Sequence, residues 1–182
     1  MNYYIADTHF FHANIIKLNN RPFKDVIEMN ETLISNWNKK VKENDTIYIL
    51  GDFAYKTYEN NVLYLLDRLN GNKILVTGNH DGIILKSPNL RKKFSKIISY
   101  LEINDNGKHI ILFHYPIAEW NGFFRDDTYH FYGHIHNNKE NNSYKIMRNI
   151  DNAYNVGADI IEFTPQTLDN IIHYNKVFNK EV

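Results

Sequence analysis

Residues 47–53 read Ile-Tyr-Ile-Leu-Gly-Asp-Phe, a short apolar run that ends in a glycine and a carboxylate. A run this short, rich in β-branched and aromatic residues, predicts a buried strand. Three other runs have the same character: Tyr3–Ala6, Ile74–Val76 and Ile110–Phe113. The ends of adjacent strands lie close together in a sheet, and ligands of α/β proteins commonly bind there. We therefore expect the polar residues that follow these runs to converge on one site.

Five segments associated with apolar runs carry side chains that can bind a metal ion. They are Asp7-Thr8-His9, Gly51-Asp52-Phe53, Gly78-Asn79-His80-Asp81, Phe113-His114-Tyr115 and Gly133-His134-Ile135-His136. A single histidine at a strand end is more often structural than a ligand. Here, however, six of the nine histidines lie in or beside these segments. Imidazole and carboxylate together suit zinc, manganese, iron or nickel, and one carboxylate can bridge two ions. The pattern predicts a dinuclear metal site with seven candidate ligands: Asp7, His9, Asp52, Asn79, His114, His134 and His136.

In this order, the motifs Asp-x-His, Gly-Asp, Gly-Asn-His-Asp, His and Gly-His-x-His resemble the calcineurin-like metallophosphoesterase superfamily. Residues 7–16, followed by Arg21-Pro22-Phe23, are similar to its small, single-domain bacterial and phage branch of predicted phosphoesterases. The resemblance implies two divalent transition-metal ions, manganese first, with iron, nickel or zinc also accepted. One ion would be held by Asp7, His9, Asp52 and His136. The other would be held by Asp52, Asn79, His114 and His134, so that Asp52 bridges the two.

The resemblance also implies a reaction, the metal-dependent hydrolysis of a phosphodiester or phosphomonoester. Two such ions bind the phosphate oxygens and supply a bridging hydroxide for in-line attack. His80 would then be the general acid that protonates the leaving group, and Asp81 would be the carboxylate that orients it. No motif position is substituted, so we expect an active enzyme.

Two further residues are candidates for binding the substrate, each with an alternative. His12 lies three positions after His9, where it could reach the substrate side of the metals, or it could be a packed or solvated residue of a helix start. The guanidinium of Arg21 could clamp a phosphate, or it could brace the loop around Pro22.

Composition limits the remaining possibilities. The chain contains no cysteine, which excludes disulfides, thiolate catalysis and cysteine-ligated metals. Its 21 basic and 21 acidic residues cancel, so no global field attracts nucleic acid or an anionic membrane. No apolar stretch approaches the roughly 20 residues that span a bilayer, and no signal peptide is evident. We expect a cytoplasmic protein without a membrane partner.

The pattern of elements predicts one α/β domain over residues 1–182. Helical spacing of apolar residues predicts helices over Glu28–Val41 and Glu59–Leu69. An Asn-Gly step within residues 104–107 predicts a hairpin between Ile98–Ile103 and His109–His114. Thr164-Pro165 is a candidate helix start. Together with the resemblance, these elements indicate a four-layer αββα sandwich of two mixed sheets flanked by helices.

Two regions bear on the choice of substrate. Lys86, Arg91, Lys92, Lys93 and Lys96 form a basic cluster that could attract a nucleotide, although a solvated helix face is the commoner explanation. Residues 118–128 carry Trp120, Phe123, Phe124 and Arg125, which could form a wall over the metals or pack the loop onto the domain. A small phosphate ester is the favoured substrate, with a nucleotide as one option. A nuclease or end-processing phosphatase and a catalytically inactive scaffold are the alternatives.

Overall fold

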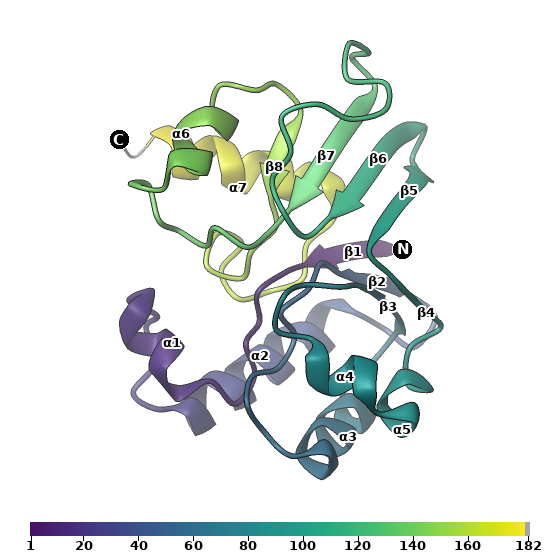
Figure 1. The fold of residues 1–182 in the computed structure, drawn as a ribbon, viewed down its shortest axis with the longest axis vertical. Coiled ribbons are helices and arrows are strands. Elements are labelled where there is room, and N and C mark those ends of the chain that lie inside the picture. The colour runs from purple at the N-terminus through teal and green to yellow at the C-terminus, as the bar shows by residue number, and fades with distance from the viewer. Residues whose placement is uncertain (181–182) are drawn as a thin grey trace.

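Two four-stranded sheets form the centre of the molecule (Figure 1), which the computed structural model describes over residues 1–180. The first sheet has the order β1 (Asn2–Ile5), β2 (Thr46–Ile49), β3 (Asn72–Val76) and β4 (Lys96–Ile98), and all its pairings are parallel. The second has the order β5 (Tyr100–Asp105), β6 (Lys108–Phe113), β7 (Thr128–Tyr132) and β8 (Ala153–Asn155). Only β5 and β6 are antiparallel. The second sheet is therefore mixed as predicted, whereas the first is purely parallel.

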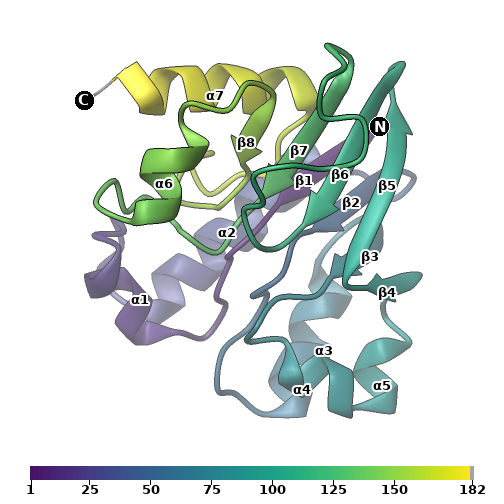
Figure 2. The ribbon, with the colours of Figure 1, turned by 45° about the horizontal axis from the view of Figure 1, so that its top comes forward.

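Helices cover the outer side of each sheet (Figure 2). The first half of the chain supplies α1 (Ala13–Leu18), α2 (Val26–Lys40), α3 (Glu59–Arg68), α4 (Gly82–Lys86) and α5 (Pro88–Arg91). The second half supplies α6 (Asn142–Met147) and α7 (Leu168–Lys180). None of the helices within residues 1–180 is long and apolar enough to cross a bilayer.

The side chains of β1 show how the layers are packed. Tyr3 and Ile5 contribute to the core that the first sheet shares with α2 and α3. Tyr4 and Ala6, which point to the opposite face, contribute to the core between the two sheets. Because successive side chains of a strand alternate between its faces, an apolar strand of this kind must be covered on both sides. The predicted αββα sandwich is confirmed.

Most predicted elements lie where the sequence placed them, within two residues at their ends. The helix predicted from Glu28 starts earlier, at Val26, because Asp25 caps it. The Asp25 carboxylate accepts a hydrogen bond from the Glu28 amide, and the Glu28 carboxylate accepts one from the Lys24 amide. Capping interactions of this kind satisfy amides that have no partner within the helix.

The helix start predicted at Thr164-Pro165 is wrong. The helix begins at Leu168, because Gln166 is used for pairing with β1. The amide of Tyr4 donates to the Gln166 carbonyl, and the amide of Gln166 donates to the Tyr4 carbonyl. The amide of Ala6 likewise donates to the Val156 carbonyl. The chain that follows β8 thus joins the free edge of the first sheet, which brings the loops of both sheets together.

Candidate metal centre

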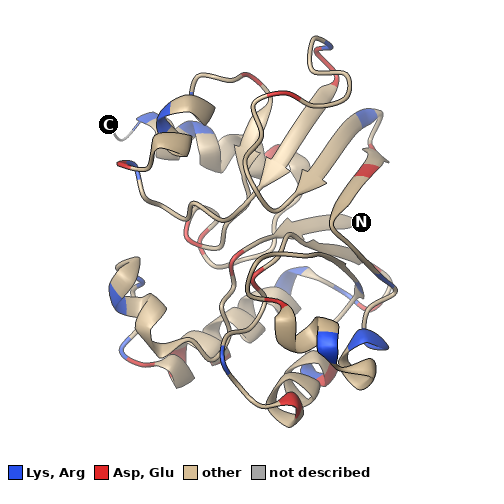
Figure 3. Ribbon diagram, viewed as in Figure 1, with Lys and Arg blue, Asp and Glu red and all other residues tan. Residues whose placement is uncertain are grey.

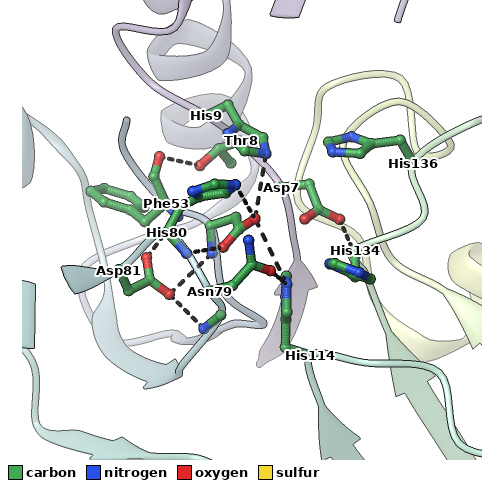
Figure 4. Close-up of polar contacts among 12 residues, drawn as sticks. Asp7, Thr8, His9, Phe53, Asn79, His80, Asp81, His114, His134 and His136 are labelled. Carbon is green, nitrogen blue, oxygen red and sulfur yellow. Dashed lines mark hydrogen bonds and ion pairs between the residues drawn. The ribbon is translucent and has the colours of Figure 1, made fainter. Parts of the chain in front are cut away.

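The loops after β1, β2, β3, β6 and β7 meet at the carboxyl ends of their strands and carry all seven predicted ligands. In Figure 4, His9 and His80 lie on one side of the centre and His134 and His136 on the other, with Asp7 and Asn79 between them. Five of the seven adopt positive φ: Asp7, His9, Asp52, His134 and His136. Such backbone costs of order 1–3 kcal/mol per residue and clusters at functional sites. It turns each side chain sharply away from its strand toward the shared centre.

Two glycines of the motifs make room for the carboxylates. A Cβ atom at Gly78 would collide with the Asp52 side chain, and one at Gly133 would collide with the Asp7 side chain. These positions therefore require glycine for close approach rather than for flexibility.

The ligand atoms form two compact groups. Atoms of Asp7, His9 and His136 lie within 4.8 Å of one another, and so do atoms of Asp7, Asp52 and His114. Asp52 belongs to the second group and also approaches the first, because its Oδ2 is 3.7 Å from His114 Nε2 and 3.6 Å from His9 Nε2. Asp7 contributes to both groups, although the family resemblance assigned it to one metal only.

Hydrogen bonds orient two of the histidine ligands toward the centre. His114 Nδ1 donates to the Leu50 carbonyl at 2.7 Å, which leaves Nε2 as the nitrogen that faces the centre. That nitrogen lies 3.1 Å from the acceptor Asn79 Oδ1. A proton or a cation between the two atoms satisfies both. His136 is oriented in the same way, by donation from Nδ1 to Asp159 Oδ2 at 2.8 Å.

Buried atoms without hydrogen-bond partners also fit a metal site. Asp7 Oδ1 and both ring nitrogens of His9 are buried and have none. Buried polar atoms are normally paired, so this concentration fits a site that holds a cation. Burial raises the pKa of Asp7 to about 6 and lowers the pKa of His9 to about 2. His9 therefore stays neutral, which is the form that binds metals.

His134 reaches the edge of the centre. Its amide donates to Asp7 Oδ2 at 2.8 Å, and its ring centroid is 5.2 Å from that of His114. Its nitrogens lie outside both compact groups.

A family model for calcineurin-like phosphoesterases matches residues 3–162, a range that includes every residue of the centre. The chain belongs to the calcineurin-like phosphoesterase family. This phosphoesterase is 38% identical over 171 residues to an uncharacterized protein of Methanocaldococcus jannaschii, a match that covers 93% of this chain and 88% of that protein. A crystal structure of a protein of unknown function from Aquifex aeolicus has a TM-score of 0.74 and 32% identity, with 95% of this chain and 98% of that chain covered.

A shorter match joins the phosphoesterase to the gene 66 protein of Mycobacterium phage L5. The two are 32% identical over 83 residues, which cover 44% of this chain and 39% of that protein. Family membership and the ligand groups make the protein a metal-dependent phosphoric ester hydrolase.

The structure corrects the role predicted for Asp81. This carboxylate is buried, and no hydrogen bond or ion pair within residues 1–180 joins it to the His80 ring. Instead it accepts hydrogen bonds from the amides of Asp52 and Phe53 at 3.0 Å and from that of Gly78 at 2.7 Å. Asp81 therefore fixes the loop of Asp52, whereas the His80 side chain is partly exposed to solvent. His80 is held through its amide, which donates to Asp52 Oδ1 at 2.8 Å.

Arg21 braces the chain, although the segment that it braces is the one after β1 and not the loop around Pro22. Its guanidinium is fully buried and donates to the carbonyls of Asp7 and Thr8 at 2.7 and 2.9 Å. It also forms a paired hydrogen bond with the Asp159 carboxylate. All three nitrogens are thus engaged, which leaves no donor to clamp a phosphate.

Asp159 was missed from the sequence, although it orients His136. Burial raises the pKa of Asp159, but the His136 hydrogen bond and the Arg21 charge outweigh it and hold the pKa below the usual range. The sequence does contain a pattern that could have identified Asp159. Gly157 and Asp159 follow a strand in the same order as the glycines and acids of the other motifs.

Tyr55 was also missed, and it connects His12 to the centre. Its ring stacks on His12 with centroids 3.8 Å apart and meets His80 edge-on at 4.9 Å. His12 is the N-cap residue of α1, and its ring centroid lies 5.3 Å from that of His9. No sequence signal distinguishes this tyrosine among the 13 in the chain.

The aromatic loop of residues 118–128 and the basic cluster, both considered for substrate choice, have different surroundings. Trp120 is buried and packs on His130 at a centroid distance of 5.3 Å, so the loop of residues 118–128 is anchored by packing. In the basic cluster, Lys93 forms an ion pair with Asp67, whereas Lys86 borders a hollow beside His80.

Proposed function

We propose that the phosphoesterase hydrolyses small phosphodiesters or phosphomonoesters at a dinuclear centre, with diesters favoured. The proposed ligands are Asp7, His9, Asp52 and His136 for one ion and Asp52, Asn79, His114 and His134 for the other. Manganese is the first candidate, and iron, nickel or zinc would also suit these ligands. The observation that carries the proposal is the position of Asp52 Oδ2, almost equidistant from His9 and His114, which are assigned to different ions. A carboxylate in that position is suited to bridging.

When bound, two divalent cations would neutralise the phosphate oxygens and lower the pKa of water enough for attack near neutral pH. Hydrogen bonds within the protein orient the proposed ligands for that chemistry. Asp159 and the Leu50 carbonyl fix the orientation of His136 and His114. Such outer hydrogen bonds typically contribute about 10–100-fold to metal affinity or activity.

His80 is proposed as the general acid. Its side chain is 39% exposed, and its Nε2 lies 3.9 Å from Asp52 Oδ2, at the border between the centre and solvent. From there it can donate a proton to the oxygen that leaves phosphorus as the ester P–O bond breaks, a role worth about 10²–10⁴-fold. The Tyr55 ring limits its rotation from one side. His12, stacked on the other part of Tyr55, is proposed to contact the substrate.

The nuclease alternative receives less support. It requires basic and aromatic residues to flank the metals, but Trp120 is packed on His130 and Lys93 is paired with Asp67. A small substrate does not need the extended surface that a nucleic acid would contact.

The test is hydrolysis of a chromogenic phosphodiester and the matching monoester by metal-stripped protein, with manganese, nickel, zinc or chelator added. We expect turnover that requires metal and disappears with chelator. The His173→Ala variant is a matched control, because that histidine is exposed on α7 and far from the motifs in sequence. Two bound ions without turnover of either ester under any metal would reject the proposal and favour a binding scaffold.

A further inference from the structure

A hollow of about 510 Å³ lies directly beside the proposed general acid. Asn79 and His80 form the wall nearest the metal centre, and the loop before α3 supplies Tyr55 and Lys56. Helix α4 closes the hollow with Lys86 in its last turn. Its volume falls within the range of small-molecule sites, about 300–1,000 Å³. The hollow is therefore large enough for a substantial part of a substrate.

The charge of the hollow is positive. Lys56 and Lys86 are both exposed, and no aspartate or glutamate lines the hollow. Neither lysine forms an ion pair within residues 1–180. Lys56 Nζ instead lies 5.2 Å from the centre of the Tyr55 ring. Figure 3 shows further basic positions on α5, but Arg91 and Lys92 do not line the hollow.

The position of His80 determines which part of the substrate would enter the hollow. A general acid must contact the oxygen of the leaving group, so that group lies on the His80 side of the phosphorus. The hollow starts at His80 and continues toward the two lysines. Ammonium groups bind phosphate as compact point charges and serve widely as phosphate ligands.

We propose that the hollow binds a second phosphate carried by the leaving group, so that the preferred substrates are esters of phosphorylated alcohols, such as nucleotides. The inference rests on the proposed function, since it takes its direction from His80. In the reaction, a water that has released a proton to solvent bonds through its oxygen to phosphorus, and the ester P–O bond breaks. The proton from His80 passes to the leaving oxygen, and His80 then takes a proton from solvent. The second phosphate, held by Lys56 and Lys86, does not react.

The experiment compares two ligands that differ by one phosphate, thymidine 3′,5′-bisphosphate and thymidine 5′-monophosphate. Their binding is measured by calorimetry with the manganese-loaded His80→Ala protein, in which turnover is expected to be slow enough to leave the bisphosphate intact. We expect the bisphosphate to bind at least about tenfold more tightly, the effect of one charge-assisted contact of modest strength. The ratio should shrink as salt rises, because exposed charges are screened.

Three substitutions, each made in the same protein, test whether the hollow causes the difference in affinity between the two ligands. Lys56→Ala and Lys86→Ala are each expected to reduce the affinity ratio several-fold, with thermal unfolding used to confirm that both fold. Lys92→Ala removes the same charge outside the hollow and should leave the ratio unchanged. Equal affinity for the two ligands, or a ratio that survives both hollow variants, would overturn the inference. Failure of the proposed function is a separate result, the absence of metal-dependent hydrolysis of the chromogenic esters.

Discussion

Acidification is expected to destabilise the protein through His130, a fully buried histidine outside the metal centre. Its Nδ1 donates to the Ile111 carbonyl and its Nε2 accepts from the Ile117 amide, both at 3.3 Å. A second proton would place an N–H of the ring against the N–H of Ile117. Burial is the main cause that lowers the pKa of His130 from 6.5 to about 4, despite opposing backbone hydrogen bonds.

The sign and size of the effect follow from linkage. The folded pKa lies below the unfolded pKa, so the contribution of His130 is fully present above about pH 6.5. It decreases as the pH falls toward 4, because the unfolded chain binds a proton that the folded chain excludes. The limiting slope is about 1.4 kcal/mol per pH unit. Integration between pH 7 and pH 5 gives a loss of about 2 kcal/mol in the free energy of unfolding.

Urea unfolding followed by circular dichroism at pH 7, 6 and 5, with chelator present, measures this loss. The His130→Gln variant retains a donor and an acceptor but does not titrate in this range. Other titrating groups contribute nearly equally to the pH dependence of both proteins. The difference in the free energy of unfolding between wild type and variant therefore isolates the contribution of His130. The wild-type protein should lose about 2 kcal/mol more than the variant between pH 7 and pH 5. If the free energy of unfolding fell by the same amount in both proteins between pH 7 and pH 5, the reasoning about the buried neutral ring would be refuted.

Replacement of Asp52 by Asn is expected to remove bound metal and turnover together, which metal analysis after dialysis and the chromogenic assay would check; two retained ions with normal activity would exclude bridging by Asp52. The His80→Ala variant should keep both ions but cleave an alkyl diester about 10²–10⁴-fold more slowly, with a smaller loss for a nitrophenyl ester, and an undiminished alkyl rate would disprove the general-acid assignment. The Asp159→Asn variant should weaken metal affinity about 10–100-fold through His136, measured by competition with a chelator; unchanged affinity would mean that the carboxylate does not tune this ligand.

The fold could be predicted from the sequence because the spacing of apolar residues and the order of the motifs indicate the same arrangement of strands and helices. The run at residues 47–50 is buried on both faces, and the polar residues after it could only lie at the strand end. The same logic placed all seven proposed ligands near one another. Helix boundaries were less predictable, because the start of α2 depends on the capping interaction of Asp25 rather than on apolar spacing.

Side-chain direction within loops was beyond the sequence. Asp81 follows His80 directly, yet it turns into the interior to bind three amides, because those amides have no other acceptor in the loop. Arg21 and Asp159 are 138 residues apart and meet only in the folded chain. Pattern reasoning identifies which residues reach a strand end, but hydrogen-bond competition decides which of them face the centre.

The division of the two sheets along the chain has a consequence for biosynthesis. Residues 2–98 form the first sheet and residues 100–155 the second, and each supplies only part of the proposed ligand set. Asp7, His9, Asp52 and Asn79 leave the ribosome first, whereas His114, His134 and His136 follow. Neither proposed ion has its full set of ligands in the first part alone. A nascent chain can therefore complete the two proposed ligand sets only after the second sheet has docked, so that the metal centre is finished together with the fold.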